Sequence, residues 1–370
     1  MPWSRGLAGG GLVPEMAVRT ALEALDEAGV PHCLRNGELA PSRPGEDIDL
    51  LVPHTALARL RQVLVPLGWK ELLAPGHHGH EFWVRLAVDG TWSKLDVVTE
   101  RRYGVSGEPV DDVVARRRLV DGVWVAAEED EARHRRERAA GNREIPTRWE
   151  KLRRNLPLAA RRRGVVVAIL GPDGAGKGTT IASVRAGLPV ATSAVYLGDH
   201  RASARDAGRN AGRSTASASA VEPPAPSGPL RAFKEVAFLS RKWLFHQPDI
   251  ARAYLRAWSG HVVLCDRHPL DSVAVSPQRT PLGGRVERVL ATRLTPSPDA
   301  VIVLDAPGEV LFARKGEHDP GRLERWRQGY RSLEGAHIVD TTRGVDGTTV
   351  AVWGVLWRVL ARRRGWGTRA

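Results

Sequence analysis

The chain has 370 residues, of which 42% are hydrophobic and 26% are charged, a balance typical of a globular protein with two domains. No apolar run is long enough to span a bilayer, so we expect no membrane contact. The formal net charge of +13 favours anionic partners such as nucleotides, nucleic acid or acidic lipid, although a general arginine bias explains it equally well.

The cysteine content and the N-terminus bear on the compartment. Cys33 and Cys265 lie far apart in apolar surroundings and are expected to be reduced core thiols. Residues 1–11 lack an apolar core of signal-peptide length. We therefore expect a cytoplasmic protein.

The first third of the chain alternates helical and extended patterns. We expect a helix over 15–29, a strand over 30–35, a turn at Asn36-Gly37, a strand over 46–52, a helix over 54–67, and a hairpin of 81–88 and 92–98 around Asp89-Gly90.

Three carboxylates fall on these strands. Asp47 and Asp49 point to the same side of an extended strand, and Asp96 has apolar neighbours on a later one. Such a trio suits two Mg²⁺ ions that hold a triphosphate, whereas a charged edge strand facing water is the simpler alternative. The segment from Glu15 to Glu100 resembles the minimal nucleotidyltransferase family, except that Asn36-Gly37 stands where that family has Gly-Gly or Gly-Ser.

A charged region separates this part from the next. Residues 126–163 are rich in arginine, including 133–138 and 161–163, and predict a helical linker. A nucleic-acid patch is an alternative, but no reader motif accompanies it, so we expect no specific nucleic-acid binding.

A phosphate-binding loop begins the second domain. The apolar, β-branched run 164–170 predicts a strand buried on both faces, and residues 179–186 open a helix. Backbone N–H groups of the glycine-rich turn between them would cradle a phosphate, and Lys177 would reach the β- and γ-phosphates of ATP. The expected nucleotide-binding residues are Gly171, Asp173, Gly174, Ala175, Gly176, Lys177, Gly178, Thr179 and Thr180.

Residues 199–229 contain almost no large apolar residue and are expected to be a disordered or mobile insertion. The segments that follow this insertion predict a second strand that carries candidate site residues. Residues 230–258 predict a long helix, and 261–267 predict a buried strand that ends in Asp266-Arg267. Ligands bind at the carboxyl ends of parallel strands, so both residues would meet the phosphate loop. Asp266 would hold Mg²⁺ or accept a proton, and Arg267 would grip an acceptor phosphate.

The half from Gly164 onward resembles thymidylate kinase, through Gly-x-Asp-Gly-x-Gly-Lys in the loop and the later Asp-Arg. The resemblance implies a role for Asp173 near the acceptor sugar and for Arg267 on the acceptor phosphate. The Gly178-Thr179 order is similar to adenylate kinase and related nucleoside monophosphate kinases, and leaves Thr179 to help hold Mg²⁺. The Tyr-Gln pair that follows Asp-Arg in thymidylate kinases is missing from 271–276.

A basic stretch over 314–322 lies after another buried strand, 300–305, and resembles the lid of these kinases. A lid excludes water and delivers arginines to the charge on the moving phosphoryl group. Arg314 is the first candidate and Arg322 the second. A final strand over 336–341 and an amphipathic helix over 348–362 complete the chain, and we expect that helix to pack on the sheet instead of on a membrane.

Together these patterns predict an α/β protein. Residues 164–365 would form a three-layer, parallel-sheet P-loop kinase domain of the nucleoside monophosphate kinase type, preceded by a smaller α+β nucleotidyltransferase-like domain over 12–125. The expected activity is ATP- and Mg²⁺-dependent phosphoryl transfer to a nucleotide or another phosphorylated small molecule, in a monomer or a homodimer. Alternatives are an N-terminal nucleotidyltransferase acting on a small molecule or sugar phosphate, and a binding module switched by nucleotide.

Overall fold

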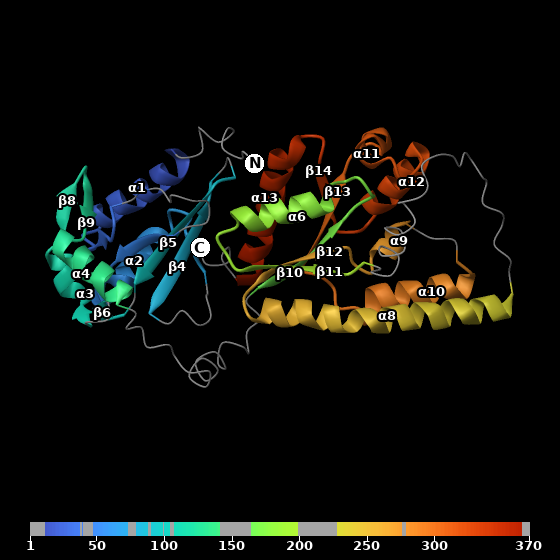
Figure 1. Cartoon of the computed structure of the whole chain (residues 1–370), viewed down its shortest axis with the longest axis horizontal. Coiled ribbons are helices and arrows are strands. Elements are labelled where there is room, and N and C mark those ends of the chain that lie inside the picture. The colour runs from blue at the N-terminus through green and yellow to red at the C-terminus, as the bar shows by residue number, and fades with distance from the viewer. Residues whose placement is uncertain are drawn as a thin grey trace.

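The computed structural model describes residues 12–37, 39, 47–72, 79–87, 90–98, 100–103, 107–140, 164–198, 228–275 and 279–364. Within these ranges the chain forms two α/β halves, each around its own sheet (Figure 1). The expected insertion at 199–229 falls almost wholly outside the described residues, as does the linker from 141 to 163.

The N-terminal half is built on a seven-stranded mixed sheet in the order β3-β4-β5-β2-β1-β9-β8. The expected hairpin is confirmed, since β4 and β5 pair antiparallel, while β5 and β2 pair parallel. The strands are β1 (Cys33–Leu34), β2 (Ile48–Leu51), β3 (Lys70–Leu72), β4 (His80–Leu86), β5 (Trp92–Val98), β8 (Arg118–Val120) and β9 (Val123–Val125).

One face of this sheet is covered by two helices, because alternate strand residues are apolar on that side. Leu50 and Leu95 from the strands join apolar side chains of α1 (Leu12–Glu27) and α2 (Leu57–Leu64) in one buried cluster. On the opposite face, Leu51 and Val98 pack against α3 (Val110–Ala115). The remaining elements are η1 (His54–Ala56), β6 (Arg102–Tyr103), β7 (Glu108–Pro109) and α4 (Glu128–Ala139).

Helix α4 falls in the expected linker but packs on the N-terminal half. Asp130 and Glu131 are buried at 4% and 7% exposure, and Arg116 donates to both Asp130 oxygens at 2.9 and 3.2 Å. Because these buried charges are paired within the N-terminal half, residues 128–139 belong structurally to it.

The C-terminal half is a five-stranded parallel sheet in the order β11-β12-β10-β13-β14. Its strands are β10 (Val165–Leu170), β11 (Thr192–Tyr196), β12 (Val262–Asp266), β13 (Ala300–Asp305) and β14 (His337–Asp340). Its helices are α6 (Lys177–Gly187), α8 (Pro229–Trp258), α9 (Asp271–Val275), α10 (Pro281–Val289), η2 (Leu290–Leu294), α11 (Gly308–Lys315), α12 (Pro320–Arg331) and α13 (Gly344–Arg364).

Helices lie on both faces of the parallel sheet, which gives the expected three layers (Figure 1). All six residues of β10 are buried, as its apolar sequence predicts. Val167 and Ile169 pack with α6 and α13, whereas Val166 packs with α8. Strand order and layering fit a P-loop NTPase-like fold. The terminal helix α13 contributes Val352 and Leu356 to the core, so it packs on the sheet as expected.

The two halves contact each other through the outer face of the β4–β5 hairpin. Phe82 and Val84 pack with Trp92, Val190 and Trp357, and the rings of Trp92 and Trp357 meet edge-on at 5.3 Å between centroids. The contact therefore joins the N-terminal sheet to α13 and to the loop before β11.

Gly90 at the tip of this hairpin fits closely against α13. Its φ is +85°, and an added Cβ would lie 2.5 Å from a methyl carbon of Val350. We expect Gly90→Ala to lower the free energy of unfolding by about 1–3 kcal/mol, because the hairpin must shift away from α13.

The matched control is Gly122→Ala, because Gly122 has a similar φ of +77° and nothing within 4 Å of the added Cβ. Thermal or urea unfolding of both variants separates the contact with α13 from backbone strain. Equal destabilisation by the two substitutions would show that the hairpin contact contributes nothing.

The buried His32 predicts a pH dependence of stability. It is 1% exposed, its Nδ1 lies 2.9 Å from the Val30 carbonyl oxygen, and burial lowers its pKa below 6.5, opposed by the Val30 bond and Asp26. As the pH falls below 6.5, His32 becomes protonated in the unfolded chain but stays neutral in the folded chain. Acidification therefore favours the unfolded chain, and the free energy of unfolding decreases as the pH falls below 6.5.

We expect His32→Asn to reduce this dependence, since an amide can still donate to Val30 but does not titrate, while His268 still contributes. Urea unfolding at pH 7.5 and 5.5 measures it, with the surface variant His54→Asn as control. An unchanged pH dependence in His32→Asn would contradict the prediction.

In the part of the chain that the structure describes, no helix combines the length and apolar character needed to cross a membrane.

Candidate active site

The phosphate-binding loop lies between β10 and α6, as expected. Gly174 and Gly176 have φ angles of +86° and +82°, which side chains rarely tolerate. A Cβ at Gly174 would also approach the Leu311 carbonyl oxygen to 2.5 Å, so the loop packs closely on α11. Lys177 Nζ donates to the carbonyl oxygens of Gly171 and Pro172 at 2.8 and 3.0 Å, which holds its ammonium over the loop.

Strand β12 brings Asp266 and Arg267 beside this loop. Asp266 pairs with Ile169 in the parallel register of β12 and β10, and the Arg267 amide donates to the Ile169 carbonyl at 3.3 Å. Arg267 has a φ of +68°, a conformation costing about 1–3 kcal/mol in a non-glycine residue and often found at functional sites. Its Nη2 donates to Asp173 Oδ1 at 2.8 Å, so the expected pair meets across the loop.

A half-buried acid, Asp271, interacts electrostatically with Arg267. Tyr330 Oη donates to Asp271 Oδ1 at 2.9 Å. Burial raises the pKa of Asp271, while Arg267 and Lys177 oppose that rise. Burial also lowers the pKa of the neighbouring His268 to about 4, so its ring is neutral at pH 7. Burial alone would lower the pKa of the Arg267 guanidinium, but the charges of Asp271 and Asp173 raise it.

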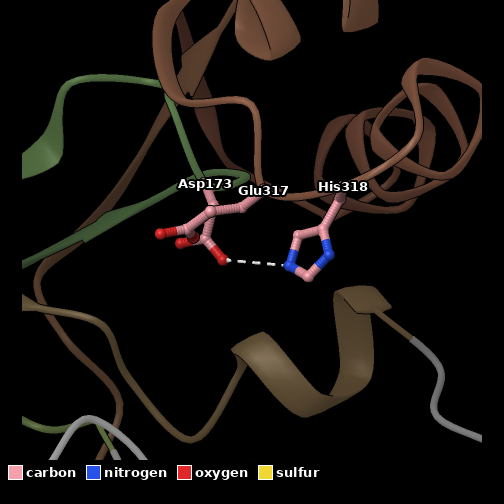
Figure 2. A group of neighbouring side chains, drawn as sticks. All are labelled: Asp173, Glu317 and His318. Atoms are coloured by element: carbon pink, nitrogen blue, oxygen red, sulfur yellow. Dashed lines mark ion pairs between the residues drawn. The ribbon is translucent and has the colours of Figure 1, made fainter. Parts of the chain in front are cut away.

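Asp173 is also the point where the lid region meets the phosphate loop. Figure 2 shows Asp173, Glu317 and His318 pointing toward one another, with His318 Nε2 3.8 Å from Asp173 Oδ2. Their donor atoms lie within 4.8 Å of one another, a spacing that a metal ion could use.

Protein cations already surround this group. Lys315 Nζ lies 2.8 Å from Glu317 and 3.9 Å from Asp173, and Lys177 is 3.8 Å from Asp173. Burial alone would raise the pKa of Asp173, but these cations together with Arg267 and His318 lower it. We therefore interpret the cluster as an ion-paired contact between lid and loop.

The two lid arginines lie in different places. Arg314 lines the cavity, and its guanidinium donates to the Thr341 hydroxyl and carbonyl at 3.0 and 2.9 Å. The Arg322 guanidinium lies over the Trp326 ring at 4.9 Å and does not line the cavity within the described residues. The structure thus brings the first candidate to the site but not the second.

A single cavity of about 1010 Å³ connects these groups. It extends from the phosphate loop to α8 and η2, and its volume lies at the upper end of those of small-molecule sites. Its lining includes Asp173, Gly174, Gly176, Lys177, Gly178, Thr179, Tyr196, Trp243, Asp266, Arg267, Asp271, Arg314, Lys315 and Glu317.

The residues expected to hold Mg²⁺ fit that ion. Asp266 has a buried Oδ1 with no hydrogen-bond partner among the described residues, and burial raises its pKa. Thr179 lies on the exposed first turn of α6 and lines the same cavity. A carboxylate and a hydroxyl are oxygen ligands of the kind that Mg²⁺ prefers.

The N-terminal acids converge but do not fit a metal centre. Asp49 and Asp96 lie side by side in the register of β2 and β5. Burial raises the pKa of Asp49, Arg35 lowers it, and Asp96 and Asp47 raise it further, so the three carboxylates interact. Each is already paired with a basic group: Asp49 with Arg35 at 2.8 Å, Asp47 with Lys94 at 2.8 Å, and Asp96 with His80 at 2.7 Å. Basic side chains of the protein thus pair with all three carboxylates and take the place that a metal ion would need.

Several site residues were not identified from the sequence. The sequence predicts no role for Asp271, which lies four residues after Arg267. His318 and Glu317 were part of the expected lid without a role. Trp243 gave no signal beyond helical spacing, because only the fold shows which face of α8 meets the cavity.

The parallel sheet and the glycine-rich loop between β10 and α6 fit an α/β protein with a P-loop NTPase-like fold. No protein-family profile and no curated protein sequence matches the chain. Among solved structures, the chain is similar to deoxyadenosine kinase from M. mycoides with bound dATP, at 14% identity and a TM-score of 0.33, over 52% of this chain and 98% of that one.

Proposed function

We propose that the protein is an ATP-dependent phosphotransferase acting on a nucleoside monophosphate or a related phosphorylated acceptor. The observation that carries this proposal is the convergence of Lys177, Asp266, Arg267 and Arg314, from three separate segments, on one cavity. Phosphoryl transfer needs positioned positive charge more than covalent chemistry, and Lys177, Arg267 and Arg314 supply it.

The chain's own groups divide the work by position. Backbone N–H groups at the start of α6 and the Lys177 ammonium bind the β- and γ-phosphates of ATP. Arg267, ion-paired with Asp173 and attracted by the charge of Asp271, holds the acceptor phosphate in line with them. Arg314 neutralises charge on the transferred group from the lid side.

Asp266 and Thr179 are the residues that would hold Mg²⁺. The ion would neutralise charge on the β- and γ-phosphates. The lid loop, through Lys315 and His318, already contacts Asp173 at 3.9 and 3.8 Å. It therefore covers the phosphate loop and limits the access of water, which would otherwise compete as acceptor.

The test is release of ADP by the full chain from Mg²⁺–ATP, across a panel of nucleoside monophosphates, nucleosides and sugar phosphates. A matched pair of substitutions locates the activity. Asp266→Asn should abolish acceptor-dependent ADP release, whereas Asp49→Asn, at a similarly buried acid, should preserve it. Tight ATP binding without turnover of any acceptor would favour a nucleotide-switched binding module instead.

A second candidate rests on the register of Asp49 and Asp96, which suits a nucleotidyltransferase in the N-terminal half. It predicts the opposite outcome: Asp49→Asn or Asp96→Asn would abolish release of pyrophosphate from a nucleoside triphosphate, while Asp266→Asn would not. The ion pairs on all three acids make this the weaker candidate.

A further inference from the structure

The cavity extends well beyond the phosphate loop, on the side away from the lid. In the sheet order the lid follows β13, on one side of β10, whereas α8 covers β12 and β11 on the other. The α8 wall is a helical stripe of Leu239, Lys242, Trp243 and His246. If ATP lies under the lid, the acceptor meets this wall, so the inference here rests on the proposed function.

Trp243 is held in one orientation by a hydrogen-bond relay. Its indole N–H donates to Thr295 Oγ1 at 3.1 Å, and that hydroxyl donates to the Leu290 carbonyl oxygen at 2.7 Å. Thr295 is 2% exposed. One hydroxyl therefore accepts from the tryptophan and donates to the backbone, which satisfies all three groups and fixes the ring.

The segment that supplies this relay is unusual. Residues Leu290–Leu294 form a single π-helical turn at the end of α10, and such turns are frequent at functional sites. The bond from Thr295 reaches back five residues to Leu290, the span of a π-turn. Leu290 and Ala291 of this turn also line the cavity.

This part of the cavity lining is suited to bind an aromatic ring. Trp243 contributes an aromatic ring to the lining, and Leu239, Leu290 and Ala291 add apolar surface. Arg267 lines the same cavity and supplies positive charge.

We infer that Trp243, Leu239, Leu290 and Ala291 form a subsite for a planar aromatic ring on the acceptor, with a nucleobase as its chemical class. Thr295 is a positioning residue that acts through Trp243. The acceptor is thus a nucleotide whose base lies against α8 and whose phosphate meets Arg267.

The test uses isosteric changes in the full chain. Thr295→Val removes the hydroxyl and leaves the Trp243 N–H unpaired, and we expect KM for the aromatic acceptor to rise about fivefold while KM for ATP is unchanged. Thr295→Ser, which keeps the hydroxyl, should restore the wild-type KM. Trp243→Leu should raise the acceptor KM by about tenfold or more.

The matched control is Thr292→Val. Thr292 lies in the same turn, its hydroxyl donates to the Arg288 carbonyl at 2.8 Å, and it is exposed to solvent. This variant should leave both KM values unchanged. A rise in both KM values in Thr295→Val, or failure of Thr295→Ser to restore the acceptor KM, would show a merely structural role and overturn the inference.

Two further outcomes separate this inference from the proposed function. Turnover of a sugar phosphate alone, insensitive to Trp243→Leu, would overturn the ring subsite and leave the kinase standing. If no acceptor turns over, the kinase proposal fails, and calorimetry then tests the subsite on its own. The inference requires that nucleoside monophosphates bind the wild-type protein and bind Thr295→Val about fivefold more weakly. Any other calorimetric result would show that the inference is wrong as well.

Discussion

Lys177→Met is expected to reduce acceptor-dependent ADP release by about 10³-fold. Lys177 is the positively charged residue of the phosphate loop, and its side chain is only 10% exposed. Charge stabilisation in a water-excluded site is worth more than in bulk water, and removal of a single such donor typically costs 10²–10³-fold. Methionine keeps the length and apolar stem, so folding should persist.

The comparison for this change is Lys234→Met, on the exposed surface of α8. It should behave as wild type in steady-state kinetics. Thermal unfolding of both variants shows whether the fold is intact. Retention of more than a tenth of wild-type kcat by a folded Lys177→Met protein would contradict a phosphate-binding role for this loop.

Arg267→Lys is expected to lower kcat/KM for the acceptor on the order of 10²-fold. Lysine preserves the charge but lacks the planar, two-pronged guanidinium. The electrostatic attraction of Asp271 then acts on a flexible ammonium, which does not hold one fixed orientation. The guanidinium now bridges toward Asp173 at 2.8 Å, and a shift of about 1 Å in the acceptor phosphate can by itself cost about 10²-fold.

Kinetics at varied acceptor and fixed, saturating ATP measure this effect, and ATP binding by calorimetry should be unchanged within about twofold. The surface change Arg343→Lys, at a side chain 76% exposed, provides the control. If Arg267→Lys weakens ATP and acceptor equally, Arg267 serves the nucleotide and not the acceptor, and its assignment here is wrong.

Much of the phosphate-loop side of the site follows from local sequence. A buried strand, glycines at positions needing positive φ, and a helix start are all consecutive, so Gly174 and Lys177 could be placed from the chain alone. To place Asp266 in the site, one further rule was needed, namely that the carboxyl ends of parallel strands lie at the same edge of the sheet. The pairing of Asp266 with Ile169 confirms that step.

The acceptor side could not be predicted in this way. Trp243 and Thr295 are 52 residues apart, and their contact depends on how α8 packs against a π-helical turn. No local pattern encodes that turn, because it differs from an α-helix by one hydrogen-bond register. The hairpin β8–β9 was likewise missed, since its strands are three residues long and Arg118 to Val120 are exposed.

The N-terminal acids show a different limit. Strand alternation correctly placed Asp49 and Asp96 on one side of the sheet. The alternation pattern did not show that Arg35, Lys94 and His80 lie next to these carboxylates in the folded protein. The acidic pattern therefore predicted a site for two Mg²⁺ ions, whereas the structure pairs all three acids with basic side chains.

The contact between the hairpin and α13 determines how the protein can be handled in the laboratory. Truncation at Gly164 would remove Phe82, Val84 and Trp92 and leave the faces of Trp357 and Val190 bare to water. Newly bared aromatic surface promotes self-association, so an isolated C-terminal fragment should precipitate or aggregate at concentrations where the whole chain stays dispersed. Expression of the intact 370-residue chain is therefore the sound starting point for every assay of the kinase cavity.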